Sequence, residues 1–170
     1  MSNDYKKWIY LIVLAIIWGS SFILIKKSLV GLSPIQLGAL RTFIAGVFVL
    51  LIGFRSLRKI KKQQWKYVVV SSLLGTLFPA FFFAFAITGI DSSVASILNS
   101  LTSLNALIVA TLFFGVVFKR VQLVGVLIGL AGTIMLILES SSLNPNQNYW
   151  YAIFVLTASL GYAFNVNIIK

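Results

Sequence analysis

Side chains suited to binding a small solute form a stripe between residues 92 and 110. The stripe consists of small or polar residues at steps of three and four, which places them on one helix face; its members are Ser92, Ser96, Asn99, Ser103, Ala106 and Ala110, with Thr102 and Asn105 beside them. Polar groups within an apolar segment must face protein or water. We therefore expect the stripe either to line a solute cavity, foremost with Asn99, Thr102 and Ser103, or to join helices by hydrogen bonds and close packing.

Arg41 is the one charge that lies clearly inside an apolar segment. It follows Pro34, a residue typical of the first turn of a helix, by about 10 Å along a helix axis. A guanidinium at that depth is costly unless it meets water, carbonyl groups or an acid, so a binding or network role is the default interpretation. It would favour solutes that carry a carboxylate. The alternative is a structural arginine that extends toward the membrane surface.

An indole and a nearby hydroxyl lie in the middle of the first apolar segment, in the run Trp18-Gly19-Ser20-Ser21-Phe22. This pair could bind a solute or could serve helix packing, and the sequence leaves both open. The predicted substrate-binding set has six members: Trp18, Ser21, Arg41, Asn99, Thr102 and Ser103.

The chain has few groups for catalysis or metal binding. It contains no cysteine and no histidine, and its three carboxylates, Asp4, Asp91 and Glu139, lie at the edges of apolar segments. The commonest metal ligand and proton carrier is therefore missing. We expect no enzyme, no catalytic residue, no cofactor and no metal site, and we expect no carboxylate inside the membrane for proton exchange.

Membrane-spanning helices must position these side chains. The chain is 59% hydrophobic, with a mean hydropathy of +1.00, and apolar runs of about 18 residues or more are long enough to cross a bilayer as helices. The alternating segments typical of membrane strands are not seen. We expect an all-α integral membrane protein, a polytopic bundle of six transmembrane helices, at Trp8 to Ile25, Pro34 to Phe54, Tyr67 to Thr88, Ser93 to Val117, Val121 to Leu138 and Tyr149 to Ile169.

The net charge of +11 is distributed between the apolar runs, which favours a membrane-topology signal over nucleic-acid binding. A cytoplasmic N-terminus places eleven Lys and Arg residues inside and two, Lys26 and Lys27, outside. We therefore predict a multi-pass protein of the cell (inner) membrane with its N-terminus in the cytoplasm. The same bias argues against a dimer of opposite topologies.

A weak internal repeat appears when the chain is offset by 142 residues. This offset aligns Val13-Leu14, Gly19 and Phe22 with Val155-Leu156, Gly161 and Phe164. Five spans precede the restart, and an odd number inverts the second copy, as in many secondary transporters. We expect residues 1–139 to form a five-span repeat, and residues 140–170 to form a loop and the first span of a second.

Motifs spread over the whole chain resemble EamA-type members of the drug/metabolite transporter superfamily. These are Trp18-Gly19-Ser20-Ser21-Phe22, Pro34 followed by Arg41, Ser92-Ser93-Val94-Ala95 through Leu112-Phe113-Phe114-Gly115, and Gly125-x-x-x-Gly129-x-x-Gly132. The resemblance implies a ten-span permease of two inverted five-span repeats, with a central cavity for a small metabolite or drug-like solute and an alternating-access mechanism.

The chain departs from this family pattern in three places. It stops after the sixth span, it has Ser103 where the family commonly has proline, and it has Val116 and Val117 near the family's glutamate. An inverted-repeat transporter fold would therefore be incomplete. The alternative is a truncated or non-transporting membrane scaffold that needs a second half or partner, either a missing C-terminal half or a further copy in a homo-oligomer.

Overall fold

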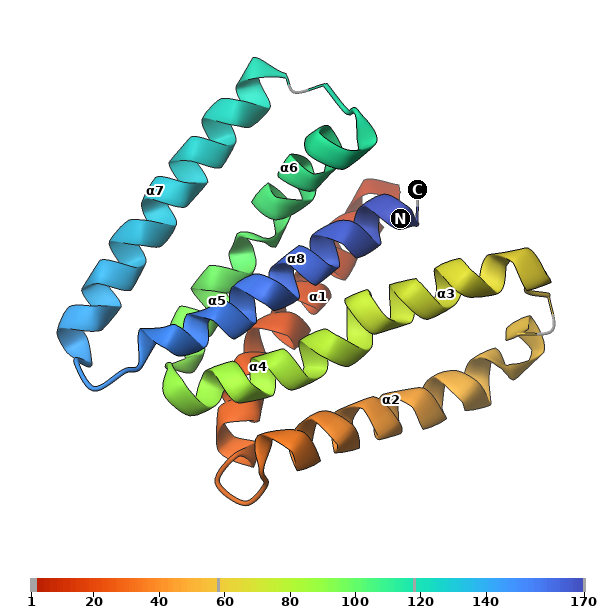
Figure 1. The fold of residues 1–170 in the computed structure, drawn as a ribbon, viewed down its shortest axis with the longest axis horizontal. Coiled ribbons are helices and arrows are strands. Elements are labelled where there is room, and N and C mark those ends of the chain that lie inside the picture. The colour runs from red at the N-terminus through yellow and green to blue at the C-terminus, as the bar shows by residue number, and fades with distance from the viewer. Residues whose placement is uncertain (1–2, 58, 118, 170) are drawn as a thin grey trace.

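The computed structural model describes residues 3–57, 59–117 and 119–169, and within these residues it contains helices and no strand (Figure 1). The α-helices are α1 (Asn3–Ser28), α2 (Pro34–Leu57), α3 (Trp65–Ser72), α4 (Phe78–Gly89), α5 (Ser92–Ser100), α6 (Thr102–Phe114), α7 (Arg120–Leu143) and α8 (Ala152–Ile168). Two 3-10 turns, η1 (Lys62–Gln64) and η3 (Tyr149–Tyr151), and a π-helical turn, η2 (Leu73–Leu77), extend or join them.

Six helical segments in the described part of the chain are long and apolar enough to cross a membrane, which confirms the predicted number. Most of the predicted span limits agree with the observed limits within three residues. The third span begins earlier than expected, at Lys62, because η1 adds a turn in which the Gln64 side chain accepts a hydrogen bond from the Lys61 backbone. The fourth ends at Phe114 because Gly115 adopts φ +66°, a conformation that glycine favours at helix ends.

The last helix, α8, lies in the middle of the bundle. It runs between α4 and α6 and packs against both (Figure 1). α2 packs against α4 on one side, and α7 packs against α5 on the other. The sixth span is thus held between the third and fourth spans.

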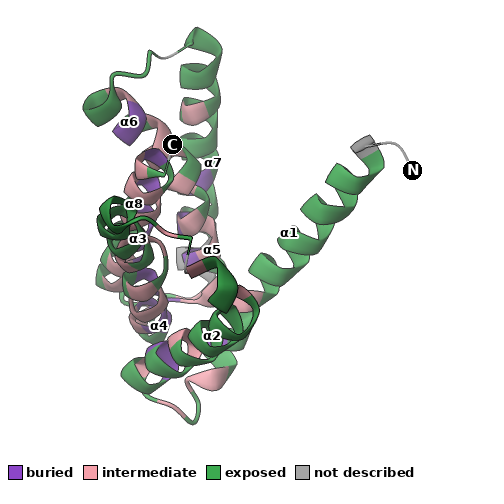
Figure 2. Cartoon of the chain, turned by 90° about the vertical axis from the view of Figure 1, so that its right-hand side faces the viewer, coloured by how far each residue is buried: buried purple, intermediate pink, exposed green. Residues whose placement is uncertain are grey.

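The first helix, α1, departs from this arrangement. Figure 2 shows its N-terminal part standing away from the other helices. Residues 5–20 are exposed, whereas Phe22 and Ile25 are buried. The C-terminal end of α1 therefore joins the core, and most of its length does not.

The core lies where the end of α1, the end of α4, the start of α5 and the start of α8 meet. Its members are mostly small or β-branched side chains, which allow helices to approach closely: Phe22, Ile25, Leu37, Phe83, Ala84, Ala86, Ile87, Ile90, Val94, Ala95, Leu98, Val155 and Ala158. Four alanines in this set bring the backbones of α4, α5 and α8 together.

Polar contacts fasten the loop before α8 to the α4–α5 turn. The Asn148 backbone N–H donates to the Gly89 carbonyl (2.9 Å), and the Asp91 N–H donates to Gln147 Oε1 (2.9 Å). Asn144 Nδ2 donates to Asp91 Oδ2 (2.9 Å). These bonds position the first turn of the sixth span.

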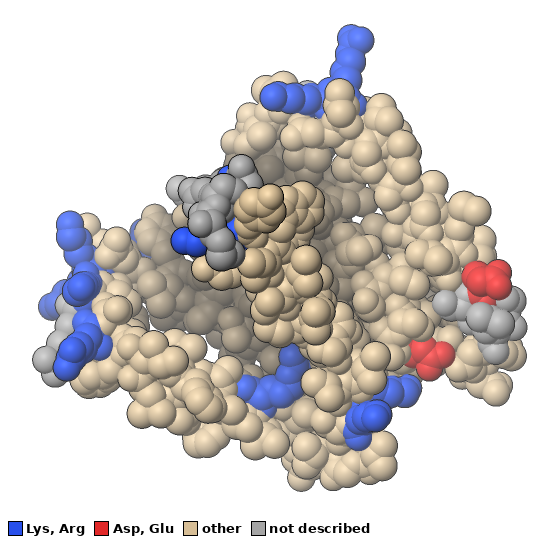
Figure 3. All heavy atoms as spheres, turned by 180° about the vertical axis from the view of Figure 1, so that it is seen from behind, with Lys and Arg blue, Asp and Glu red and all other residues tan. Residues whose placement is uncertain are grey.

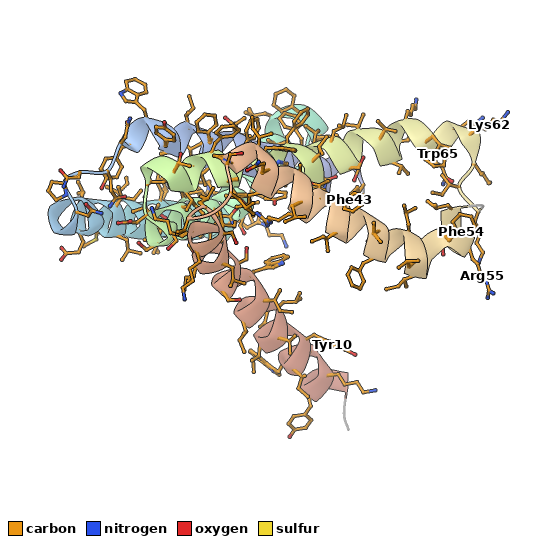
Figure 4. All side chains as sticks on the ribbon, turned by 90° about the horizontal axis from the view of Figure 1, so that it is seen from below. Tyr10, Phe43, Phe54, Arg55, Lys62 and Trp65 are labelled. Carbon is orange, nitrogen blue, oxygen red and sulfur yellow. The ribbon has the colours of Figure 1, made fainter. Side chains whose placement is uncertain are left out.

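Charged side chains lie mainly at helix ends. Figure 3 shows groups of Lys and Arg separated by broad uncharged surface, on a face that is hollowed on both sides of the projecting α1. Figure 4 shows Arg55 and Lys62 at the end of the α2–α3 pair that lies farthest from the other helices. Lys26, at the end of α1, lies 4.0 Å from Asp91 and donates to the Ile87 carbonyl (3.2 Å).

The glycine ridge of α7 does not serve helix packing within this chain. A Cβ added at Gly125, Gly129 or Gly132 would meet nothing within 4 Å. Within the described chain, no other helix therefore packs closely against these three glycines. The ridge borders a groove of about 320 Å³ between α7 and the fourth span.

Candidate functional site

Arg41 lies at a close helix crossing. Gly38, one turn before it on α2, has the ring of Phe81 from α4 in the space that a side chain at this position would need. Arg41 is half-buried, and its Nη1 atom is fully buried without a hydrogen-bond partner. Its guanidinium interacts electrostatically with Tyr162 of α8. The crossing therefore holds a half-buried cation that has one buried, unpartnered nitrogen and interacts with a phenol.

Aromatic rings extend from this point across the bundle. Tyr162 stacks on Phe83 of α4, with ring centroids 6.2 Å apart, and Phe83 meets the edge of Phe22 of α1 at 5.4 Å. We call Arg41, Tyr162, Phe83 and Phe22 the Arg41 cluster. It joins four helices and combines a row of aromatic rings with one positive group, an arrangement suited to a solute with a carboxylate and an apolar part.

Trp18 and Ser21 adjoin this cluster on α1. Trp18 lies four residues before Phe22 and so on nearly the same helix face, and it is 69% exposed. Ser21 is half-buried. Within this chain, Trp18 does not enclose the Arg41 cluster, because α1 diverges from the bundle just before that point (Figure 2).

The fourth span is interrupted in the middle of the polar stripe. α5 ends at Ser100 and α6 begins at Thr102, with Leu101 in a turn conformation between them. Thr102 Oγ1 donates to Asn99 Oδ1 (3.3 Å) across the break. Discontinuous helices often form solute sites in transporters, since irregular backbone at membrane depth must be buried in protein or face a cavity.

The break also divides the predicted site. Ser103 is exposed and lines the groove beside α7, together with Gln122, Gly125, Gly129 and Thr133. Asn99 and Thr102 instead pair with each other. The structure thus does not bring the six predicted residues together: Arg41 lies at the α2–α4 crossing, Trp18 and Ser21 on α1, Asn99 with Thr102 at the break, and Ser103 in the α7 groove.

Amide side chains join the fourth and sixth spans. Asn105 Nδ2 donates to Ser159 Oγ (2.7 Å), and Asn167 Nδ2 donates to the Ala106 carbonyl (2.9 Å). The packing interpretation of the stripe therefore holds for its second half, at Asn105 and Ala106. Sequence reasoning did not single out Asn167, although an amide within a span signals an interhelical bond.

A second polar site lies beside the π-helical turn, and sequence reasoning missed it. The amide of Asn165 lies directly against Gly75, and its Oδ1 atom is buried without a partner. A cavity of about 690 Å³ adjoins it between α3 and α8. Its lining residues are Ile60, Gln64, Tyr67, Val68, Ser71, Ser72, Thr76, Asn165, Ile168 and Ile169. The signal in the sequence was Gly75 with Pro79, because proline removes a helical hydrogen bond and favours such irregular turns.

Groups of three or more Asp, Glu, His or Cys that could hold a metal ion are not found among the described residues. The polar atoms of these sites are amides, hydroxyls and one guanidinium. They can bind a solute by hydrogen bonds and charge.

Comparison with known proteins relates these sites to a family. The model of the EamA-like transporter family matches residues 6–138. The "Uncharacterized inner membrane transporter YedA" of Escherichia coli K12 is 31% identical over 163 residues, which cover 91% of this chain and 50% of the relative. An "Uncharacterized transporter" of Archaeoglobus fulgidus is 30% identical over 137 residues, 77% of this chain and 47% of the relative.

No solved structure matches the chain. The chain spans about half the length of the curated relatives it matches. The family match covers the first five spans and the motifs that carry the resemblance. The chain is therefore a multi-pass membrane protein that belongs to the EamA-like transporter family.

Proposed function

We propose that this chain forms one wall of a permease for small carboxylate-bearing solutes, which works by alternating access together with a second, inverted set of spans. Residues 1–139 are the first repeat of this permease, and residues 140–170 begin the second. The family supports transport, and its relatives, about twice as long, support a second half.

The observation that carries the choice of solute is the buried, unpartnered Nη1 of Arg41. A buried donor without an acceptor costs free energy, and more so when it carries charge. A solute carboxylate would accept from this group, and the rings of Tyr162, Phe83 and Phe22 would contact the apolar part of the solute. Trp18 and Ser21 would meet the solute from α1.

The breaks in two spans support a mechanism with moving parts. The third span changes to a π-helical turn at Leu73–Leu77, and the fourth is interrupted at Leu101. Each break leaves backbone groups outside the regular helical pattern, so rotation there disrupts fewer bonds than in a regular helix. Rocking of one repeat against the other would use these points, with Asn99 and Thr102 at the second.

Replacement of Arg41 tests this function. The chain would be reconstituted into lipid vesicles, alone and with the half of the E. coli relative that it does not match, and uptake of radiolabelled amino acids and small organic acids would be measured. Arg41→Ala should reduce uptake by about tenfold or more, because hydrogen bonds to charged groups contribute roughly 1.5–3 kcal/mol. Arg41→Lys should retain part of it.

Lys27→Ala is the matched control, since Lys27 is an exposed cation at the end of α1. It should transport like the unchanged chain. Equal uptake by Arg41→Ala and the unchanged chain would reject Arg41 as the solute anchor. Absence of uptake in both arrangements would favour a non-transporting scaffold.

A further inference from the structure

The third and sixth spans differ in length, which creates a step at one end of the bundle. The third span, Lys62–Gly89, has 28 residues, and the sixth, Tyr149–Ile168, has 20. At about 1.5 Å per residue, these lengths are about 42 Å and about 30 Å. The two spans are joined at one end, where the Asn148 N–H donates to the Gly89 carbonyl (2.9 Å). At the other end, the third span therefore extends about 12 Å beyond α8, and Figure 1 shows the start of α3 beyond the end of α8.

This step lies at the depth of the lipid headgroups. A helix of about 30 Å spans the hydrocarbon layer, and chain that continues beyond it lies among the headgroups. The sixth span has this length, so the part of the third span that extends past it lies in the headgroup region. Trp65 and Tyr67, residue types typical of the membrane surface, belong to this part.

The cavity of about 690 Å³ occupies the step. On the α8 side it is lined by the last turn, at Asn165, Ile168 and Ile169. Ile169 is 65% exposed, so the cavity is open toward the surrounding lipid. The third span contributes one helix face, at Gln64, Tyr67, Val68, Ser71, Ser72 and Thr76.

The polar groups of the cavity can bind both a hydroxyl and a phosphate. Asn165 Oδ1 is buried without a hydrogen-bond partner, and an unmatched acceptor costs free energy. A ligand that carries a hydroxyl group can donate to this oxygen. The hydroxyls of Tyr67 and Ser71 can in turn donate to phosphate or ester oxygens. Asn165 lies only three residues, about 4.5 Å, before the end of α8, which is within reach of a headgroup.

The segment beside the cavity is strongly basic. Residues 55–66 contain six Lys or Arg residues and no Asp or Glu. Figure 3 shows a group of Lys and Arg at this end of the molecule, and Figure 4 places Lys62 there. Lys66 Nζ lies 4.8 Å from the ring centroid of Tyr67, so its ammonium group is beside a residue that lines the cavity. Such a cluster attracts anionic lipids.

From these observations we infer that the step between α3 and α8 is a binding site for an anionic phospholipid with a hydroxylated headgroup, of the phosphatidylglycerol type. The phosphodiester lies near Lys62 and Lys66, and a headgroup hydroxyl donates to Asn165 Oδ1. The apolar side chains of Val68 and Ile168 contact the carbon atoms of the lipid's glycerol backbone. This inference does not depend on the proposed transport function.

The apolar part of the cavity favours a lipid over a soluble phosphate ester. Ile60, Val68, Ile168 and Ile169 account for four of its ten lining residues. A small phosphate ester would leave these side chains in contact with water, whereas a lipid covers them. A role in membrane topology explains the sign of the nearby charges, but it does not explain a cavity with an unmatched acceptor.

Lipid titration tests the inference. The purified chain in mild detergent would be titrated with dioleoyl forms of phosphatidylglycerol, phosphatidylmethanol and phosphatidylcholine, and bound lipid would be measured by native mass spectrometry. Phosphatidylcholine, which has no net charge, should bind about tenfold more weakly than phosphatidylglycerol, or weaker still. Phosphatidylmethanol keeps the negative charge and lacks the hydroxyls, so it should bind about threefold more weakly.

Two variants separate the charge from the hydroxyl. Lys62→Gln with Lys66→Gln should weaken phosphatidylglycerol binding by about tenfold or more. Lys119→Gln with Arg120→Gln is the matched control, because it removes the same charge from exposed residues on the same predicted side, and it should leave binding unchanged. Asn165→Ala should remove the preference for phosphatidylglycerol over phosphatidylmethanol. Circular dichroism would show that each variant is folded.

Several results would overturn the inference. Equal binding of phosphatidylglycerol and phosphatidylcholine would show that the cavity does not select an anionic lipid. Equal losses in the two double variants would show that only net charge matters. A hydroxyl preference that persists in Asn165→Ala would contradict the assigned contact. Displacement of the lipid by equimolar sn-glycerol 3-phosphate would assign the cavity to a soluble phosphate ester instead.

Discussion

Arg41 and Tyr162 are brought together from α2 and α8, helices that are distant in the sequence. The N–H groups of the positively charged guanidinium and the O–H group of the phenol can both donate hydrogen bonds to one carboxylate. Phe83 packs on the Tyr162 ring and limits its movement. A rigid pair of donors of this kind loses little entropy when a solute binds.

Tyr162→Phe would remove the hydroxyl and keep the ring that packs on Phe83. We expect solute uptake to fall by roughly three- to tenfold, the effect of one hydrogen bond of about 0.5–1.5 kcal/mol. Uptake by vesicles at several solute concentrations would measure it. Tyr10→Phe is the control, because Tyr10 lies on the free part of α1 (Figure 4); a similar loss in both variants would show that the hydroxyl has no specific role.

The helices depart from regularity where they carry polar groups. The break at Leu101 lies between Asn99 and Thr102, and the π-helical turn places Gly75 against the Asn165 amide. The same turn meets Gly161 of α8. The third span therefore contacts α8 at its irregular turn, and α8 packs within the bundle that the first five spans form.

Gly161→Leu would place a side chain against the Leu74 carbonyl. Since backbone cannot move away as a flexible side chain can, we expect the free energy of unfolding to fall by about 1–3 kcal/mol. Thermal unfolding in detergent, followed by circular dichroism, should show a lower midpoint than for Gly46→Leu, the control, because a Cβ added at Gly46 of α2 meets nothing within 4 Å. Equal midpoints would mean that α8 and the third span can separate without cost.

Eleven of the fourteen Lys and Arg residues of the whole molecule lie on one predicted side of the membrane. The chain contains no cysteine, so single cysteines can report sidedness. Gln63→Cys lies in the basic turn before α3, and Asn146→Cys lies in the loop before α8; both positions are exposed.

With a cytoplasmic N-terminus, a membrane-impermeant thiol reagent applied to intact cells should label Asn146→Cys and leave Gln63→Cys unlabelled until the cells are opened. The opposite pattern would reverse the predicted orientation. Labelling of both positions in intact cells would indicate two orientations, and would weaken the argument against pairing between copies of this chain.

The amino-acid sequence by itself determined the six spans, because hydropathy over about 20 residues is a local property that decides whether a helix can cross lipid. It also identified Arg41 as the unusual charge. It could not assign Asn99 and Ser103 to different places, because that depends on the turn at Leu101 and on which helices lie beside the span.

Only the tertiary structure decided which groups meet. Tyr162 beside Arg41, Asn165 against Gly75, and the burial of α8 beside the free face of α1 all depend on neighbours far apart in the chain. At matching positions, α1 and α8 share a Val-Leu pair, a glycine (Gly19 and Gly161) and a phenylalanine. Their environments differ because a helix in lipid is buried by its partners and not by its own sequence.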